Sequence, residues 1–514
     1  MRRALIGLTL LTASSVGAAL PTPALAGDFM DTRITFVLGD DDVLHGAGQT
    51  TPSSPRASFA VREGRLFFLD NHNKKDSGQE TQTHLVTYKS MPGFIQGLTT
   101  EAGLILQFDL GRGTFGDKET FRDDGTYINL KYVSEGRPKD ALNITLFPFS
   151  TDRFQLGYSY RLSWGSSRLF GQQRKGPAPG LKVSGIKDLG GGADAFWFVG
   201  AKTAPIQRLE PEDEPEKNDE VDSFYAVLAG GGYDSGFVRG EVGGGFFQRG
   251  TNPRKEVRGE PVNAYGASVQ LTLHEGVDIR RSADFSLYRN DPTRIPRRSG
   301  GKAKDGWVAA SEFSLLFQEL EDPNSVGGTS LQRAMAGDIN IRFRSGPWEP
   351  FADLVYRDVQ FILFNVPSFV PYQDFNDALQ ITPELWAGVG LNYHLADMHL
   401  TPGFVLGVQR PAAAQVVIEA GTFPGDSITG LKTVAIKREG GLVILPDGED
   451  VLPTVVGRVQ VRWDMSPMAA LIGEIFAGYD PNRAEYEDDS SGIAERIFED
   501  PLLAGFTLIT QARF

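Results

Sequence analysis

The sequence predicts an all-β protein, a single transmembrane antiparallel β-barrel of about 16 to 18 strands with short periplasmic turns and long extracellular loops. Three observations predict this class. The clearest segments alternate apolar and polar residues with period 2, and no apolar run after the N-terminus is long enough for a membrane-spanning helix. The chain also begins with an export signal, which leaves residues 27–514 as one barrel domain.

The export signal occupies residues 1–26. Arg2 and Arg3 precede an apolar run from Ala4 to Leu20, and the small-residue triplet Ala24-Leu25-Ala26 follows it. A basic start, an apolar run and an A-x-A-like site together indicate a secretory signal peptide, so we expect cleavage after Ala26. An uncleaved membrane anchor is the alternative, but it requires a longer apolar stretch and no cleavage site.

Composition excludes several classes of protein. The chain has no cysteine, which rules out a disulfide framework, a thiolate metal site and a cysteine nucleophile. Its formal net charge of −14 makes it a poor candidate for binding the phosphates of nucleic acid. Glycine is abundant, at 60 of 514 residues, and its scattered distribution indicates use inside ordered structure.

Alternating apolar and polar residues predict the strands, and residue types that favour turns predict the links between them. Turn-forming residues at 148–152, 345–347 and 464–467 predict tight links, and polar stretches at 166–180, 210–220, 289–306, 363–383 and 480–500 predict long loops. If the turns at 148–152 and 345–347 are both periplasmic, the strands between them do not pair off, so at least one strand is missed or invented. No convincing helix is predicted. The clearest strands are Arg153–Ser163, Tyr265–Leu273, Asp338–Arg344 and Val455–Asp464.

Weaker patterns predict the other strands. They lie at Ala57–Leu69, Gln82–Lys89, Thr99–Phe108, Thr126–Val133, Leu142–Phe147, Ala195–Lys202, Phe224–Leu228, Ser235–Gln248, Asp278–Tyr288, Trp307–Gln318, Phe351–Phe361, Leu385–Leu395, His399–Val408 and Ala469–Tyr479.

The last residues of the chain point to a membrane system. Phe506, Leu508 and Phe514 share one face of a terminal segment whose final residue is phenylalanine. Such an ending resembles the carboxy-terminal insertion signal of Gram-negative outer-membrane β-barrel proteins, and the chain is similar in length to the porin-like members. The resemblance implies a place in the cell outer membrane, contact with its lipid and lipopolysaccharide, and recognition by the barrel-assembly machinery through the last strand. A secreted sandwich or propeller is the alternative, and neither requires a terminal phenylalanine.

Arginines dominate the polar faces of the clearest strands. These faces are expected to point into the lumen, where a rigid guanidinium suits contact with carboxylate or phosphate groups. The sequence therefore predicts a pore that mildly favours anions. Pairing of these arginines with loop carboxylates folded into the lumen is an equally supported alternative, with a structural role only. The predicted pore-lining residues are Arg153, Arg161, Arg342, Arg344, Arg458 and Arg462, against the carboxylates Asp338 and Asp464.

The sequence predicts no catalytic, metal or cofactor site, and the protein is not expected to be an enzyme. It has neither an H-E-x-x-H nor a G-x-S-x-G motif. His394 and His399 flank a short turn, where exposed residues are favoured over a metal pair. The acidic runs Asp40–Asp42 and Glu210–Glu220 are expected to be solvent-exposed charged segments rather than cation-binding sites.

The favoured function is therefore a porin-like channel for passive diffusion of small hydrophilic solutes. The alternative is a closed structural or receptor barrel that serves a cell-envelope complex. The sequence leaves open which solute passes and whether three copies associate.

Overall fold

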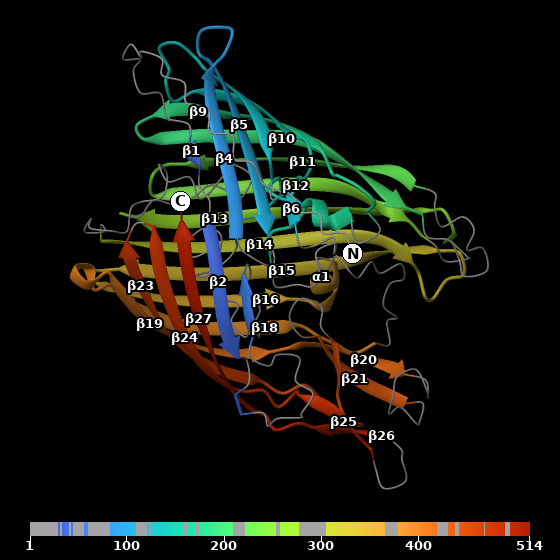
Figure 1. The fold of residues 1–514 in the computed structure, drawn as a ribbon. Coiled ribbons are helices and arrows are strands. Elements are labelled where there is room, and N and C mark those ends of the chain that lie inside the picture. The colour runs from blue at the N-terminus through green and yellow to red at the C-terminus, as the bar shows by residue number, and fades with distance from the viewer. Residues whose placement is uncertain are drawn as a thin grey trace, which may run out of the picture.

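The fold is a large twisted sheet that closes on itself (Figure 1). The computed structural model of the protein describes residues 29–30, 33–40, 43–44, 56–59, 83–108, 121–123, 125–157, 162–170, 174–208, 221–252, 257–276, 305–364, 379–418, 430–436, 442–466, 468–488 and 494–513.

The principal sheet contains 21 strands, paired antiparallel wherever they meet. Its first half comprises β1 (Phe29–Met30), β2 (Arg33–Asp40), β3 (Arg56–Phe59), β4 (Thr83–Pro92), β5 (Leu98–Phe108), β6 (Phe121–Asp123), β7 (Tyr127–Val133), β8 (Ala141–Phe147), β9 (Gly180–Gly190), β10 (Ala193–Gln207) and β11 (Val221–Asp234). Its second half comprises β12 (Val238–Thr251), β13 (Pro261–Glu275), β14 (Gly306–Glu321), β15 (Thr329–Arg344), β16 (Trp348–Arg357), β18 (Glu384–Tyr393), β19 (Leu400–Arg410), β23 (Thr454–Ser466), β24 (Ala469–Tyr479) and β27 (Leu502–Arg513).

Closure is made by the two ends of this sheet. β2 pairs with β27 over a continuous register that runs from Arg33 opposite Arg513 to Asp40 opposite Phe506. Three short strands each lie end to end with a longer one, because both pair with the same neighbour: β1 with β2, β3 with β4, and β6 with β7. The 21 described strands therefore fill 18 positions around the barrel. The predicted single antiparallel barrel is confirmed, at the upper end of its predicted size.

The two rims of the barrel differ in the length of their connections. At one rim, residues 191–192, 235–237 and 345–347 form tight links, and the first and last strands begin and end there. At the other rim, 32 residues join β8 to β9 and 43 join β19 to β23. Short turns at one rim and long loops at the other match the predicted arrangement. The connection from β13 to β14 is an exception, because its 30 residues start and finish at the turn rim.

Burial alternates along each wall strand, and this alternation identifies the inner and the outer face of the wall. In β23, Val455, Val459 and Val461 are exposed on the outside, whereas Arg458 and Gln460 are buried on the inside. β13 and β15 follow the same rule, with Val269 and Ile339 pointing outward. The prediction that polar faces line the lumen is confirmed on these strands.

The clearest predicted strand is wrong. The described residues of this stretch, 153–157 and 162–163, do not belong to the wall but to the connection between β8 and β9, and their apolar side chains lie in the barrel interior. Within it, a bridge pairs Leu156 with Trp164, and a single 3-10 turn, η2 (Ser167–Phe170), follows. The predicted turn at 148–152 is the start of this connection, at the rim opposite to the turn at 345–347, which resolves the mismatch in strand pairing. We call the described residues 148–157 and 162–170 the inward segment.

One helix and two small sheets also escaped the sequence patterns. A short helix, α1 (Val359–Phe364), follows β16 and places Phe361 and Phe364 in the interior. Beyond the loop rim lie two small sheets, made by β17 (Ile381–Thr382), β20 (Ala412–Ile418), β21 (Gly430–Ile436) and β22 (Leu442–Ile444), and by β25 (Ala484–Asp488) with β26 (Ala494–Phe498). The predicted strand Asp278–Tyr288 lies outside the described residues.

In the part of the chain that the structure describes, every helix is too short or too polar to span a bilayer.

Candidate pore lumen

Four of the predicted pore-lining arginines lie on the inner face of the wall. Arg342 and Arg344 are on β15, and Arg458 and Arg462 are on β23. The registers of β15, β16, β18, β19 and β23 place Arg342 and Arg458 in one row across these strands. Strand pairing therefore brings these residues, far apart in the sequence, into one row of the wall.

Carboxylates accompany two of these arginines. Arg462 pairs with Asp464 at 2.7 Å, and Nη1 of Arg344 lies 3.7 Å from Glu349. Both carboxylates belong to wall strands, whereas the alternative expected loop carboxylates as the partners of these arginines. Glu474 on β24 stands opposite Gln460, in the row next to Arg458. The lumen is thus mixed in charge rather than lined by arginine alone.

The other two predicted pore-lining residues do not lie on the wall. Arg153 belongs to the inward segment and is only 5% exposed, because it lies against the wall within that segment. Arg161 lies outside the described residues. The assignment of Arg153 to a lumen-facing strand is therefore wrong.

The inward segment is fixed to the wall by an apolar core. Phe154 stacks on Phe147 of β8 and meets Phe198 of β10 edge-on, with ring centroids 6.2 Å apart in each pair. Trp164 and Phe170 both contact the ring of Phe247 on β12. These rings are buried, so the segment behaves as part of the protein core rather than as a surface loop.

Buried hydrogen bonds add specific anchors to this core. Nζ of Lys202 on β10 donates to the carbonyl oxygens of Thr151, Phe154 and Gly165, so the three acceptors lie within the inward segment. A lysine ammonium has three donor hydrogens, and these carbonyls match that number. The segment is therefore tied to the wall at a buried cation.

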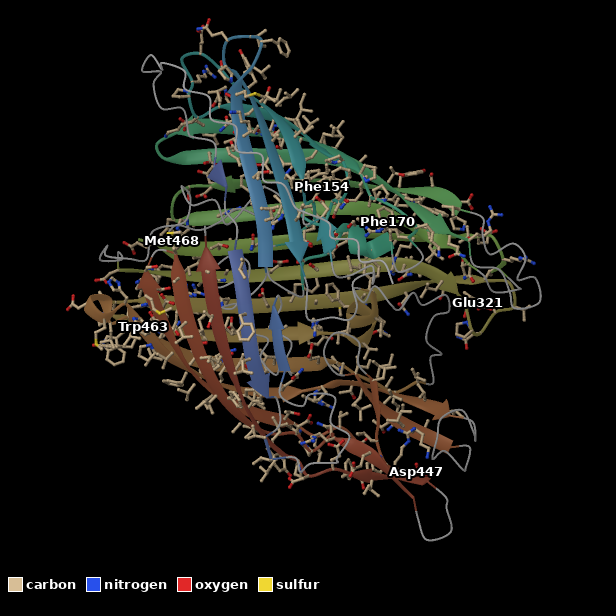
Figure 2. All side chains as sticks on the ribbon, viewed as in Figure 1. Phe154, Phe170, Glu321, Asp447, Trp463 and Met468 are labelled. Carbon is tan, nitrogen blue, oxygen red and sulfur yellow. The ribbon has the colours of Figure 1, made fainter. Side chains whose placement is uncertain are left out.

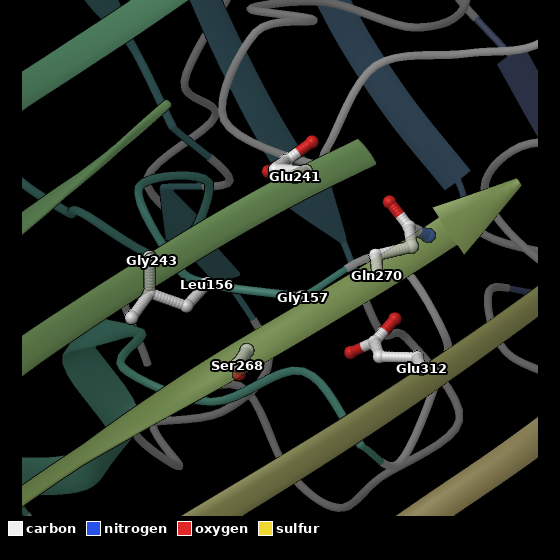
Figure 3. A pocket seen from close by; sticks show the side chains of 7 residues that line it. All are labelled: Leu156, Gly157, Glu241, Gly243, Ser268, Gln270 and Glu312. Carbon is white, nitrogen blue, oxygen red and sulfur yellow. The ribbon is translucent and has the colours of Figure 1, made fainter. Parts of the chain in front are cut away.

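A recess remains where the inward segment meets the wall (Figure 3). It is small and partly open, and it lies between the inward segment and strands β12 to β14. At its edge Gly157 has φ +86°, and a Cβ there would lie 2.3 Å from Oε1 of Glu312. Only glycine fits this backbone conformation and close approach. The recess is lined by Leu156, Gly157, Glu241, Gly243, Ser268, Gln270 and Glu312.

The outer face carries aromatic side chains in two bands. Near the turn rim, Phe237 contacts Trp307 and Trp348 contacts Tyr393, with centroids 5.8 and 4.5 Å apart. Near the loop rim, Tyr265 stacks on Phe317. Trp307 and Phe317 both lie on β14, and ten residues of a strand tilted by about 40° span about 25 Å.

This spacing matches the apolar band of an outer-membrane barrel, flanked by aromatic girdles. Figure 2 shows Trp463 and Met468 at the turn rim and Glu321 near the loop rim, while Phe154 and Phe170 lie between them.

The predicted insertion signal has the expected face. Phe506 and Leu508 are each 39% exposed and point outward from β27, whereas Thr507 and Ile509 are buried on the inside. Phe514 lies outside the described residues.

The remaining candidate residues are two histidines and two acidic runs. His394 contacts Thr401 and Glu349, at 3.2 and 3.3 Å, and His399 has a left-handed backbone in the adjoining turn. Among the described residues, no three potential metal ligands gather at one point. Asp41, Asp42 and the run 210–220 lie outside the described residues, and Asp40 pairs through its backbone with Phe506.

Comparisons with known proteins find likenesses of structure only. No family model matches the sequence, and no curated protein matches it. OpdK from Pseudomonas aeruginosa is similar at a TM-score of 0.39 and 7% identity, over 96% of this chain and 100% of that one. OccAB3 of Acinetobacter baumannii gives 0.39 and 9%, over 95% and 100%. An anion-selective porin from Comamonas acidovorans gives 0.35 and 9%, over 95% and 99%.

These scores and identities are too low to support an argument, so the classification depends on the molecule's own strand pairing and surface. A sheet closed by β2 and β27, an apolar outer face and two aromatic bands give the chain the architecture of a membrane-spanning antiparallel β-barrel.

Proposed function

We propose that the protein is a passive channel for small hydrophilic solutes, with a preference for anions. The observation that carries this proposal is the asymmetry of the lumen. The anchoring contacts of the inward segment described above are to β8, β10 and β12, whereas the four wall arginines lie on β15 and β23. Solutes would pass along this second part of the wall.

Two arginines on this wall are partly open to the lumen. The side chains of Arg344 and Arg462 are 28% and 12% exposed, so water and solutes can reach part of each side chain. Charged groups on a wet lumen wall act on passing ions without the full cost of burial.

The test is single-channel current through the purified, refolded protein in a planar bilayer with a salt gradient. We expect stable current steps and a reversal potential that favours anions. Arg458→Glu with Arg462→Glu should move the reversal potential toward cations. Arg410→Glu is the matched control, because Arg410 is exposed on the outer face at the end of β19. Steps without anion preference would contradict the selectivity alone.

A closed structural or receptor barrel is the second candidate. It is favoured by the extent of the interior apolar cluster, which reaches from Val86 on β4 through Phe154 to Phe476 on β24. A folded barrel that migrates faster before heating than after it, yet carries no current, would support this candidate and contradict the channel.

We also propose how the protein matures and which molecules surround it in the membrane. We expect removal of residues 1–26, so N-terminal sequencing of the protein from outer membranes should begin at Gly27. Its partners would be membrane lipid, lipopolysaccharide and, during insertion, the barrel-assembly machinery. Association into a homotrimer stays a prediction, and cross-linking in native membranes tests it.

A further inference from the structure

A buried arginine joins two parts of the interior that come from different connections. Arg249 lies on the inner face of β12 and is 2% exposed. Its Nε donates to the carbonyl oxygen of Leu169 in the inward segment at 3.0 Å, and its Nη2 donates to that of Phe364 in α1 at 3.3 Å. One guanidinium therefore binds both the connection after β8 and the connection after β16.

The wall and an aromatic ring complete the environment of this guanidinium. Nη1 donates to Oε1 of Gln318 on β14 at 3.0 Å, which fixes the plane of the group. The ring of Phe364 lies 4.7 Å from its central carbon, a geometry that favours a cation. Arginine supplies these donors from three nitrogens of one rigid plane, whereas the three donors of a lysine ammonium share a single nitrogen.

We propose that Arg249 is a positioning residue that holds α1 and the inward segment against each other and so sets the free cross-section of the lumen. The effect of Arg249 on the cross-section rests on the proposed channel function. The coupling of α1 to the inward segment through Arg249 does not depend on conductance. Lys202 provides the contrast, because the bonds described above tie it to the inward segment and not to α1.

Thiol labelling tests the coupling directly, since the chain has no cysteine of its own. Ala226→Cys reports on the inward segment, because Ala226 is buried on β11 beside Phe247, whose ring Trp164 and Phe170 contact. Val359→Cys reports on α1. In the parent protein both thiols should react slowly with a water-soluble maleimide. Arg249→Met should speed the labelling of both, whereas Lys202→Met should speed only that of Ala226→Cys.

Conductance tests the consequence. Arg249→Met should raise single-channel conductance above the spread of parent channels and add current fluctuations, without changing the reversal potential. Arg410→Met, which removes an exposed outer arginine, should change neither. If Arg249→Met fails to fold, Arg249→Lys keeps the charge, lacks the planar fork and serves in its place.

The outcomes separate this inference from the channel proposal. Faster labelling at only one thiol, or at neither, would overturn the coupling whatever the conductance. Faster labelling at both thiols with unchanged parent-like conductance would overturn the claim that Arg249 sets the cross-section. A silent parent with a conducting Arg249→Met would support the inference and contradict an open channel.

Discussion

The indole Nε1 of Trp164 donates a hydrogen bond of 2.7 Å to Oγ of Ser268, joining the inward segment to β13. Oγ of Ser268 also lies 2.8 Å from Oγ of Ser314 on β14, and the latter donates to the carbonyl oxygen of Leu162. This chain of buried polar groups returns to the segment from which it starts, so removal of any member leaves a neighbour without its partner.

Trp164→Phe should therefore destabilise the barrel by about 1 to 3 kcal/mol, through the lost hydrogen bond and the smaller ring. Equilibrium unfolding in guanidinium chloride, followed by refolding, measures the change. Trp197→Phe is the matched control, because Trp197 is 44% exposed on the outer face. Equal effects of the two substitutions would contradict the anchoring role of Trp164.

Loss of a lumen carboxylate should act opposite to loss of an arginine. Glu474 is 4% exposed on the inner face of β24, and Glu474→Gln keeps its shape while removing its charge. We expect the reversal potential to move further toward anions. Glu275→Gln, on the outer face at the turn rim, should leave it unchanged. A shift toward cations from Glu474→Gln would contradict the charge assignment of the lumen.

The start of α1 should respond to pH. Burial raises the pKa of Asp358 from 3.8 to about 6, although its carboxylate accepts bonds from the backbone of Phe361 and Met335. A raised pKa means that the folded protein holds a proton that the unfolded chain releases. The resulting stabilisation is present below pH about 4 and is lost as the pH rises through 6.

Amide hydrogen exchange of α1, corrected for the intrinsic effect of pH, should therefore be faster at pH 8 than at pH 5. Asp358→Asn removes the titrating group and should abolish the difference. A pH dependence that survives this substitution would assign the effect to another group.

The two faces of β23 should tolerate charge differently. Val459 is 58% exposed on the outer face, and its neighbour Gln460 points inward. Val459→Arg should cost about 2 to 4 kcal/mol in lipid vesicles, the range for a cation on the lipid face near mid-bilayer. Gln460→Arg should cost much less. Equal costs, measured by unfolding from vesicles, would contradict the assignment of the outer face to lipid.

Deletion of Phe514 should slow insertion without changing the inner wall. Because the outward face of β27 carries Phe506 and Leu508, the terminal residue would extend the same apolar face. The yield of heat-modifiable barrel in the outer membrane measures the effect. The inward-facing Gln511→Ala is the control, and an equal loss from both variants would argue against a face-specific signal.

Alternation predicted the wall wherever lipid and water lie on opposite sides of a strand, as at Val459 and Gln460. It failed at Arg153–Ser163 because Phe154, Leu156 and Leu162 are apolar for another reason, namely that they are buried in the apolar core inside the barrel. β9 was missed because its glycines and lysines hide the pattern, although Lys182 points inward.

Part of the lumen wall could be predicted from the sequence, again where the polarity of a strand is clear. Arg342, Arg344, Arg458 and Arg462 lie in strands with clear polarity, so their direction could be derived. Glu474 lies in a strand that is apolar on both faces, and its inward direction follows only from its register with β23. Arg249 carries no local signal, since its partners lie 80 and 115 residues away in the sequence.

The pairing of Phe36 with Thr510 also dictates an order of events. A barrel whose seam joins segments from opposite ends of the chain cannot be sealed until both have arrived at the same place. Every other neighbouring pair of wall strands can meet earlier, as an open curved sheet. Until the seam forms, two unpaired edges stay exposed and invite pairing with other chains. Aggregation therefore competes with closure of the barrel until the seam has formed.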